Sequence, residues 1–419
     1  MAGFRFLHAA DIHLDSPLHG LARYDGIPAG DVRSATRSAF DNLIHYACTE
    51  AVDFVLIAGD LFDGDWKDMS TGLYFARAMG KLAAADIPVF LLAGNHDAAS
   101  VLTRQLPWPD NVRQFSTRRP ETHVIEPLGV AIHGQSFANA SVTDNLAAAY
   151  PAAAAHRFNI GMLHTAMAGH EGHAPYAPCE VGDLLAKGYD YWALGHVHDH
   201  EIVHEAPHIV YSGNLQGRHI REAGIKGAVL VEVEDNAVAR LRHVPLDVLR
   251  WARVPVDCAA IEDQSALDTA VSAALTRHHS ELSDGRPLVA RVVISGATAL
   301  AGTLHDRSAM LRDEVRALAA AIAPDLWIEK VQLDVTAPVL ADAPAAPDDF
   351  LALLAEAADA PELAGMLADE LGPFLLAAAK AGEPAEGDLA TLARSGDWPA
   401  LVRTAGAALG ARLSGAEAG

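Results

Sequence analysis

Five polar clusters follow one another along the first half of the chain, and each supplies side chains that can bind a divalent cation. In chain order they are Asp11-Ile12-His13, Gly59-Asp60-Leu61-Phe62-Asp63, Gly94-Asn95-His96-Asp97, His164 and Gly195-His196-Val197-His198. Hydrolysis of a phosphodiester at neutral pH needs a nucleophilic hydroxide and relief of charge on the phosphoryl oxygens. Two divalent metals about 3.5 to 4 Å apart provide both. The clusters therefore predict a site that hydrolyses phosphoesters with two metal ions.

The types and spacing of these ligands suit two metals that share one carboxylate. Two clusters have ligands at positions i and i+2, namely Asp11 with His13 and His196 with His198. Two such side chains on an extended segment point to the same side, so each pair is expected to grip one metal. Asp60 has two carboxylate oxygens and is the expected bridge, while Asn95 offers a neutral oxygen. Glycines precede several ligands and are expected to allow a tight turn or a close backbone approach, at Gly59, Gly94 and Gly195.

Each cluster follows a short apolar run of the kind that forms a β-strand, and helical stretches separate these runs. This order predicts an α/β fold up to about residue 250, in which ligands gather outside the carboxyl ends of the strands. The predicted strands are Phe4 to Ala9, Phe54 to Ala58, Val89 to Ala93, Val130 to His133, Asn159 to Leu163, Tyr191 to Leu194, His208 to Tyr211 and Ala228 to Val233.

The pattern changes after the catalytic domain, which we place at residues 1–250, and it predicts three further parts. Residues 251–336 show the order strand, helix, strand, helix, strand, which predicts a small second α/β domain. Residues 337–348 are rich in Ala, Pro and Asp, as is typical of a linker. Residues 349–419 carry apolar side chains at helical spacing and predict short amphipathic helices that either pack on the protein or dock a partner.

Composition and cysteine usage indicate a globular α/β protein with more than one domain, since 419 residues exceed one ordinary core. The three cysteines lie far apart and predict neither a disulfide framework nor a CxxC zinc site, so a reducing cytoplasm is the expected location. Neither a signal peptide nor an apolar run of about 18 residues is found, so secretion and membrane spanning are not expected.

The formal net charge of -23 argues against a broad, autonomous DNA-binding face. Affinity for duplex DNA comes largely from Lys and Arg side chains that neutralise phosphates. Bound divalent metals would reverse the local field at the site. A basic partner subunit could supply the remaining affinity for DNA.

The set of clusters resembles the calcineurin-like metallophosphoesterases. The stretch Leu7-His8-Ala9-Ala10-Asp11-Ile12-His13-Leu14-Asp15-Ser16-Pro17-Leu18 looks like the YhaO branch of the SbcD nuclease group, and so does Tyr211-Ser212-Gly213-Asn214-Leu215-Gln216-Gly217-Arg218. The likeness is strong over about residues 4–250 and extends to the second domain only in its arrangement. It implies a four-layer αββα sandwich with a small α/β capping domain and a C-terminal helical region.

The resemblance also implies roles for individual residues. One metal would be held by Asp11, His13, Asp60 and His198, and the other by Asp60, Asn95, His164 and His196. His96 would contact the scissile phosphate as a transition-state stabiliser or proton donor, and Asp97 could orient His96. Members of this family usually use manganese, so the resemblance implies two Mn²⁺ ions, with iron and zinc as the alternatives. The implied function is a DNA exonuclease or endonuclease in DNA repair, with an SMC-like coiled-coil ATPase partner and a homodimeric state.

Some residues leave alternatives open. The nuclease subunits of the group often have His where this chain has Asp63, three residues after Asp60. This departure and the acidity keep a small-molecule phosphodiesterase or phosphatase on the same site as an alternative, and a weakly active scaffold as a third hypothesis. Basic residues after the Ser-Gly-Asn turn either contact phosphate or form a solvated loop, namely Arg218, His219 and Arg221. Four other histidines are not expected to be ligands: His170, His173, His200 and His204.

Overall fold

The structure is a computed structural model that describes residues 3–16, 18, 29–64, 70–99, 108–167 and 176–337, with residues 366, 398 and 400–402. Backbone contacts divide the chain into two compact units, Met1–Ala252 with Glu281–Val289 and Arg253–Ser280 with Ala290–Gly419. The predicted linker at 337–348 and helical region at 349–419 lie almost entirely outside the described residues. Within the described part of the chain, no helix has the length and apolar character needed to cross a bilayer.

The first sheet of the larger unit has six strands in the order β12-β11-β1-β2-β3-β4. Strands β1 to β4 run parallel, whereas β11 pairs antiparallel with both β1 and β12. The strands are β1 Phe4–Ala9, β2 Phe54–Ala58, β3 Val89–Leu92, β4 Val112–Gln114, β11 Gly227–Glu234 and β12 Ala237–Pro245. Every residue of β2 and β3 is buried, as expected for parallel strands that are covered on both faces.

The second sheet also has six strands, in the order β5-β6-β7-β8-β10-β9. Its four inner strands are parallel, and the edge strands β5 and β9 are antiparallel to their neighbours. The strands are β5 Glu121–Ile125, β6 Val130–Gly134, β7 Phe158–His164, β8 Tyr191–Gly195, β9 Glu201–Glu205 and β10 His208–Tyr211. In each sheet the neighbouring parallel strands run in the same direction, so their carboxyl ends lie at one edge.

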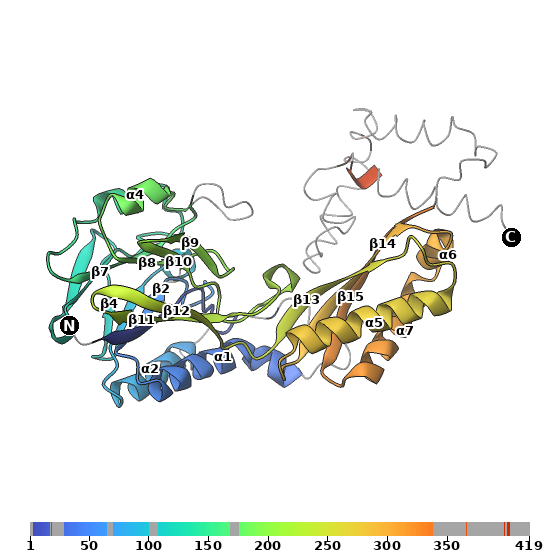
Figure 1. Cartoon of the computed structure of the whole chain (residues 1–419), viewed down its shortest axis with the longest axis horizontal. Coiled ribbons are helices and arrows are strands. Elements are labelled where there is room, and N and C mark those ends of the chain that lie inside the picture. The colour runs from blue at the N-terminus through green and yellow to red at the C-terminus, as the bar shows by residue number, and fades with distance from the viewer. Residues whose placement is uncertain are drawn as a thin grey trace. The chain divides into compact units, whose positions relative to one another are not determined.

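The two sheets pack face to face, with helices on both outer sides (Figure 1). Aromatic rings join the sheets: Phe6 of β1 meets Tyr191 of β8 edge-on, at 5.2 Å between ring centroids. The outer face of the first sheet packs against α1 and α2, and that of the second against α4. These helices are α1 Ala29–Thr49, α2 Ser70–Ala83 and α4 Val181–Leu185. The predicted αββα sandwich is confirmed.

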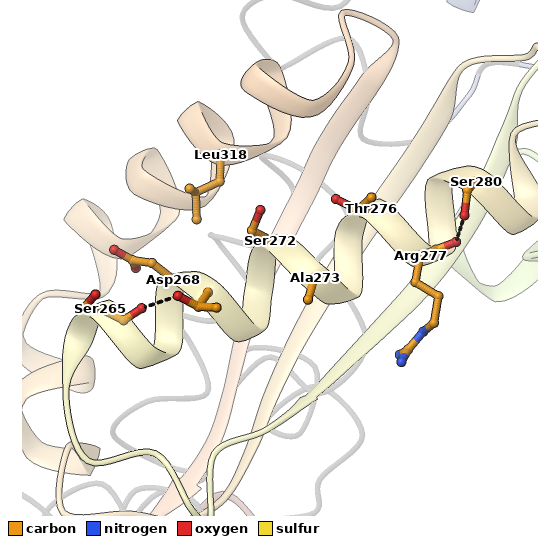
Figure 2. Close-up of a pocket in the computed structure, with 9 residues that line it drawn as sticks. Ser265, Asp268, Ser272, Ala273, Thr276, Arg277, Ser280 and Leu318 are labelled. Carbon is orange, nitrogen blue, oxygen red and sulfur yellow. Dashed lines mark hydrogen bonds between the residues drawn. The ribbon is translucent and has the colours of Figure 1, made fainter.

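Up to residue 336, the described part of the smaller unit contains a three-stranded sheet in the order β13-β14-β15 and three helices. Its elements are β13 Arg250–Asp257, α5 Gln264–Leu282, β14 Leu288–Ala297, α6 Ala301–Asp306, α7 Ser308–Ile322 and β15 Leu326–Thr336. Buried apolar residues of α5 and α7 lie at helical spacing and form the core of this unit with the sheet, at Leu267, Val271, Leu275, Leu311, Val315 and Ala319. An open groove of mostly small polar side chains runs along α5 beside Leu318 of α7 (Figure 2). The capping role of the second domain stays a prediction.

Candidate metal centre

The carboxyl ends of five parallel strands bring the predicted site residues together. Asp11 follows β1, Asp60 follows β2, and Asn95 begins the short helix α3 (Asn95–Ala99) after β3. His164 is the last residue of β7, and His196 follows β8. Three overlapping groups of candidate metal ligands result, each with its ligand atoms within 4.8 Å of one another.

The first group is Asp11, His13 and His198. The Nε2 atoms of His13 and His198 lie 3.3 Å apart, and His198 Nε2 lies 3.8 Å from Asp11 Oδ1. That carboxylate oxygen is buried and has no hydrogen-bond partner among the described residues. Burial raises the pKa of Asp11 to about 6. A buried carboxylate oxygen that faces two imidazole nitrogens is satisfied by a cation, so these side chains fit a metal ion.

The second group is Asp60, His164 and His196, with Asn95 beside it. His164 Nε2 lies 3.4 Å from Asp60 Oδ2 and 3.0 Å from Asn95 Oδ1. Its other nitrogen, Nδ1, donates to the carbonyl of Ala58 at 3.0 Å, which directs Nε2 at the centre of the group. Burial acts to lower the pKa of His164, but the Asp60 carboxylate raises it to about 9. Without a metal, a proton thus takes the position that a cation would fill.

Asp60 lies between the two groups, because it also forms a group with His13 and His96. Its Oδ1 accepts a hydrogen bond from the backbone N–H of His96 at 2.9 Å, while Oδ2 faces His164. Burial acts to raise the pKa of Asp60, but the His164 imidazole outweighs it and holds the pKa well below its usual range. This position suits a carboxylate that is shared by two cations.

The backbone around these ligands is left-handed rather than extended. Positive φ angles occur at Asp11 (50°), His13 (46°), Asp60 (49°) and His196 (98°). The expectation that Asp11 and His13 project from an extended segment is therefore wrong. Hydrogen bonds from their N–H groups to the carbonyls of Gly59 and Asp60, each 3.0 Å, hold this conformation. Such residues cost about 1 to 3 kcal/mol each and are concentrated at functional sites.

Two glycines confirm the expected close approach of backbone to ligands. Gly59 has φ of +99°, and a Cβ on it would overlap the ring of His164. A Cβ on Gly94 would overlap the carboxylate of Asp60. Any larger residue at either position would displace a ligand.

His96 stands at the open side of the centre, since 41% of its side chain is exposed, compared with 20% for His198 and burial of most of the other ligands. Its Nδ1 lies 3.2 Å from Asp63 Oδ1, and the same oxygen lies 3.4 Å from His13 Nδ1. Asp97 does not face His96 but accepts hydrogen bonds from three backbone N–H groups, those of Leu61, Phe62 and Gly94. The expectation that Asp97 orients His96 is therefore wrong, and the carboxylate that contacts the His96 ring is that of Asp63.

Comparison with known proteins places the chain in a family. Residues 4–200 match the model of the calcineurin-like phosphoesterases, and residues 251–336 match that of the middle domain of metallophosphoesterase YhaO. "Uncharacterized metallophosphoesterase YhaO" of Bacillus subtilis (strain 168) is 35% identical over 295 residues, which cover 70% of this chain and 71% of that protein. This chain belongs to the calcineurin-like metallophosphoesterase family. Family members depend on two metals, so the protein is a metal-dependent phosphoester hydrolase.

Two solved structures are also similar to this metallophosphoesterase. One is a dimetal phosphatase from Danio rerio, with 12% identity and a TM-score of 0.34, covering 55% of this chain and 93% of that one. The other is GAP50, the anchor in the inner membrane complex of Plasmodium, with 13% identity and a TM-score of 0.33, covering 58% and 89% respectively.

The metallophosphoesterase also has a buried ionic pair beside the first group, which the sequence did not reveal. Arg218 and Glu222 are both buried, and Glu222 Oε1 lies 2.8 Å from His198 Nδ1. The alternative of a solvated basic loop is wrong for Arg218, whereas Arg221 is exposed. A lone glutamate in a short 3₁₀ turn has no pattern that marks it before folding. His219 Nε2 lies 3.5 Å from Glu222 Oε1.

Two of the four histidines that were not expected to be ligands lie among the described residues. His200 Nδ1 lies 2.9 Å from the carbonyl of Tyr211, and His204 Nδ1 lies 2.8 Å from that of Pro207. Neither belongs to a candidate metal group among the described residues. His170 and His173 lie outside the described residues.

Proposed function

We propose that this metallophosphoesterase cleaves the phosphodiester bonds of DNA with two bound divalent cations. The observation that carries the proposal is the pair of ligand groups on either side of Asp60, with an exposed imidazole, His96, beside them. DNA as the substrate rests on the likeness of two sequence stretches to the SbcD and YhaO group, the stretches that begin at Leu7 and Tyr211.

The donor set assigns each side chain a role in holding the cations. One cation would be held by Asp11, His13, Asp60 and His198, and the other by Asp60, Asn95, His164 and His196. Oxygen and nitrogen ligands of this kind are compatible with Mn²⁺. When bound, the pair would supply Lewis acidity and charge neutralisation at the phosphoryl group.

The protein's own residues then position the phosphate and move one proton. His96 donates a proton to the leaving oxygen, which is the role that its exposed ring beside the ligand groups permits. Asp63 accepts from His96 Nδ1–H and stabilises the imidazolium form, in which Nε2 also carries a proton and can donate it to the leaving oxygen. The hydrogen bond to Asp63 raises the pKa of His96, which keeps this acid protonated to higher pH. Asn95 contributes a neutral oxygen and limits the negative charge that the incoming phosphate must approach.

The net charge of -23 supports a partner in DNA binding. A protein with so few Lys and Arg side chains relative to Asp and Glu gains little DNA-binding free energy from contacts with phosphates. We propose an SMC-like coiled-coil ATPase as the source of basic surface, the region 349–419 as its dock, a cytoplasmic location and a role in DNA repair. A homodimer completes the proposed assembly.

The test uses metal-stripped full-length protein and end-labelled single-stranded and duplex DNA, with Mn²⁺, Mg²⁺ or Zn²⁺ restored. Asp60→Ala is the matched control, because it removes the shared carboxylate. We expect Mn²⁺-dependent cleavage by the native protein and none by the variant. Intact DNA in every reaction, with and without an SMC-type ATPase, would overturn the proposal for DNA if a small phosphodiester is cleaved in parallel.

A second candidate is a small-molecule phosphodiesterase or phosphatase on the same site. Asp63 favours it, because the nuclease subunits of the group often carry His there. It predicts turnover of p-nitrophenyl phosphodiesters or monoesters with Mn²⁺ and no turnover of DNA. Cleavage of DNA at rates above those for the small esters would exclude it.

A further inference from the structure

Glu222 is a buried carboxylate whose two oxygens are fully used. Oε1 lies 2.8 Å from His198 Nδ1 and 2.8 Å from Arg218 Nη2. Oε2 accepts from the Asn214 amide at 2.8 Å and from the backbone N–H of Arg218 at 2.7 Å. Four donors that converge on one buried carboxylate leave it a single orientation.

The contact with His198 fixes which nitrogen of that ring faces the first ligand group. A carboxylate only accepts, so His198 Nδ1 carries the hydrogen that Glu222 binds. Nε2 is then left with its lone pair, and it is the atom that faces His13 Nε2 and Asp11 Oδ1. A carboxylate behind an imidazole also makes the imidazole a stronger donor to a metal.

Arg218 holds the carboxylate in place and reaches the other side of the site. Its guanidinium lies within 3.3 Å of both Glu222 oxygens through Nε and within 3.6 Å of Asp63 Oδ1 through Nη1. Both residues of the pair come from the segment around the short 3₁₀ helix Ile220–Glu222, far in sequence from the first ligands. The pair thus comes from a different segment than Asp11 and His13, and Arg218 Nη1 links the two segments by lying 3.5 Å from Ser16 Oγ.

We propose that Glu222 is a positioning residue that sets the affinity of the cation site formed by Asp11, His13 and His198, and that Arg218 holds it there. This inference rests on the proposed function, because it assigns a cation to that group. The other cation site has its own support in the carbonyl of Ala58 behind His164, and it does not depend on Glu222.

The experiment is titration of metal-stripped full-length protein with Mn²⁺, with free Mn²⁺ measured by electron paramagnetic resonance. Native protein is expected to bind two ions. Glu222→Gln keeps the shape of the side chain but removes its charge, and one dissociation constant should rise by roughly 10- to 100-fold while the other stays unchanged. If this variant does not fold, Arg218→Gln with Glu222→Gln removes both buried charges together and poses the same question.

Two controls separate positioning from a general loss of stability. Arg291 and Glu329 form another buried pair, with two bonds of 2.8 Å between β14 and β15 of the smaller unit. Glu329→Gln should lower the melting temperature and leave both Mn²⁺ constants unchanged. His198→Ala should abolish one site, and adding Glu222→Gln to it should not weaken the site that remains.

The outcomes are distinguishable. Native protein that binds fewer than two Mn²⁺ ions overturns the proposed function itself. Two-site binding by native protein with unchanged constants in Glu222→Gln overturns only the role of Glu222. Weakening of the remaining site in the double variant, or equal weakening by Glu329→Gln, shows that Glu222 acts on the whole fold and refutes the positioning role.

Discussion

Asp63→Asn removes the charge, but not the shape, of the carboxylate beside His96. In the native protein Asp63 Oδ1 lies 3.2 Å from His96 Nδ1 and 3.6 Å from Arg218 Nη1. Arg218 keeps its contacts with Glu222 after the change, so the fold and the surrounding ionic pair should persist. The effect should therefore fall on His96 and on turnover.

The magnitude follows from the strength of the contact and its exposure. A hydrogen bond to a charged group contributes about 1.5 to 3 kcal/mol. The side chains are 41% exposed at His96 and 23% at Asp63, so solvent screening places the value at the lower end. About 1.4 kcal/mol corresponds to a tenfold change in rate. We expect kcat to fall by about tenfold, with KM and metal content nearly unchanged.

The assay compares two phosphodiesters, one with a p-nitrophenolate leaving group and one with an alkoxide. Only the alkoxide needs a proton as it leaves, so the loss should be larger for that substrate. The hydrogen bond to Asp63 raises the pKa of His96, so the native acid stays protonated to higher pH. In the variant this pKa falls, and the alkaline limb of the kcat profile should move to lower pH.

A double-variant cycle supplies the refutation. If Asp63 acts through His96, Asp63→Asn should cost nothing further in a His96→Ala background. If the losses of kcat in the two single variants multiply in the double variant, Asp63 does not act through His96. A fall in metal content measured by elemental analysis would direct the effect to His13, whose Nδ1 lies 3.4 Å from the same oxygen.

Three further predictions concern the ligands and the core. Asp60→Ala should lower the content of both metals together with activity, and unchanged metal content would remove its assignment as the bridge. Gly94→Ala should displace the Asp60 carboxylate and abolish most metal binding. Gly80→Ala in α2 is the matched control, because a Cβ there meets open space. Since Ala favours a helix more than Gly does, this variant should raise the free energy of unfolding by about 0.5 to 1 kcal/mol in denaturant melts. Burial lowers the pKa of His8 from 6.5 to about 3, so its contribution to stability is complete above pH 6.5 and is lost as pH falls towards 3. Between pH 8 and pH 5 the free energy of unfolding should fall by about 2 kcal/mol because of His8. In His8→Gln, measured in the presence of a chelator, the fall in unfolding free energy over this range should be smaller by that amount. The same fall in the variant as in the native protein would contradict the prediction.

The strands that carry the ligands were readable in the sequence because they are buried on both faces. Of these, β1 and β2 have the predicted bounds, and each forms a continuous or nearly continuous apolar run. Strand β10, which carries no ligand, also has its predicted bounds. The predicted strands missed β4, β5, β9 and β12, which lie at sheet edges. Edge strands are partly exposed and lack the apolar run that marks a buried strand, and only pairing with a neighbour gives them their structure.

The sequence by itself determined the family, the fold and the ligand residue types, because a chain must turn polar where a buried parallel strand ends. Tertiary structure alone decided the left-handed backbone at Asp11 and His13, since that conformation is held by carbonyls of a loop nearly 50 residues away. It also decided that Asp63 faces His96 and that Glu222 supports His198. Whether Asp63 or Asp97 contacts His96 depends on the distance and orientation of each carboxylate in the folded chain. Residue spacing carries no such information.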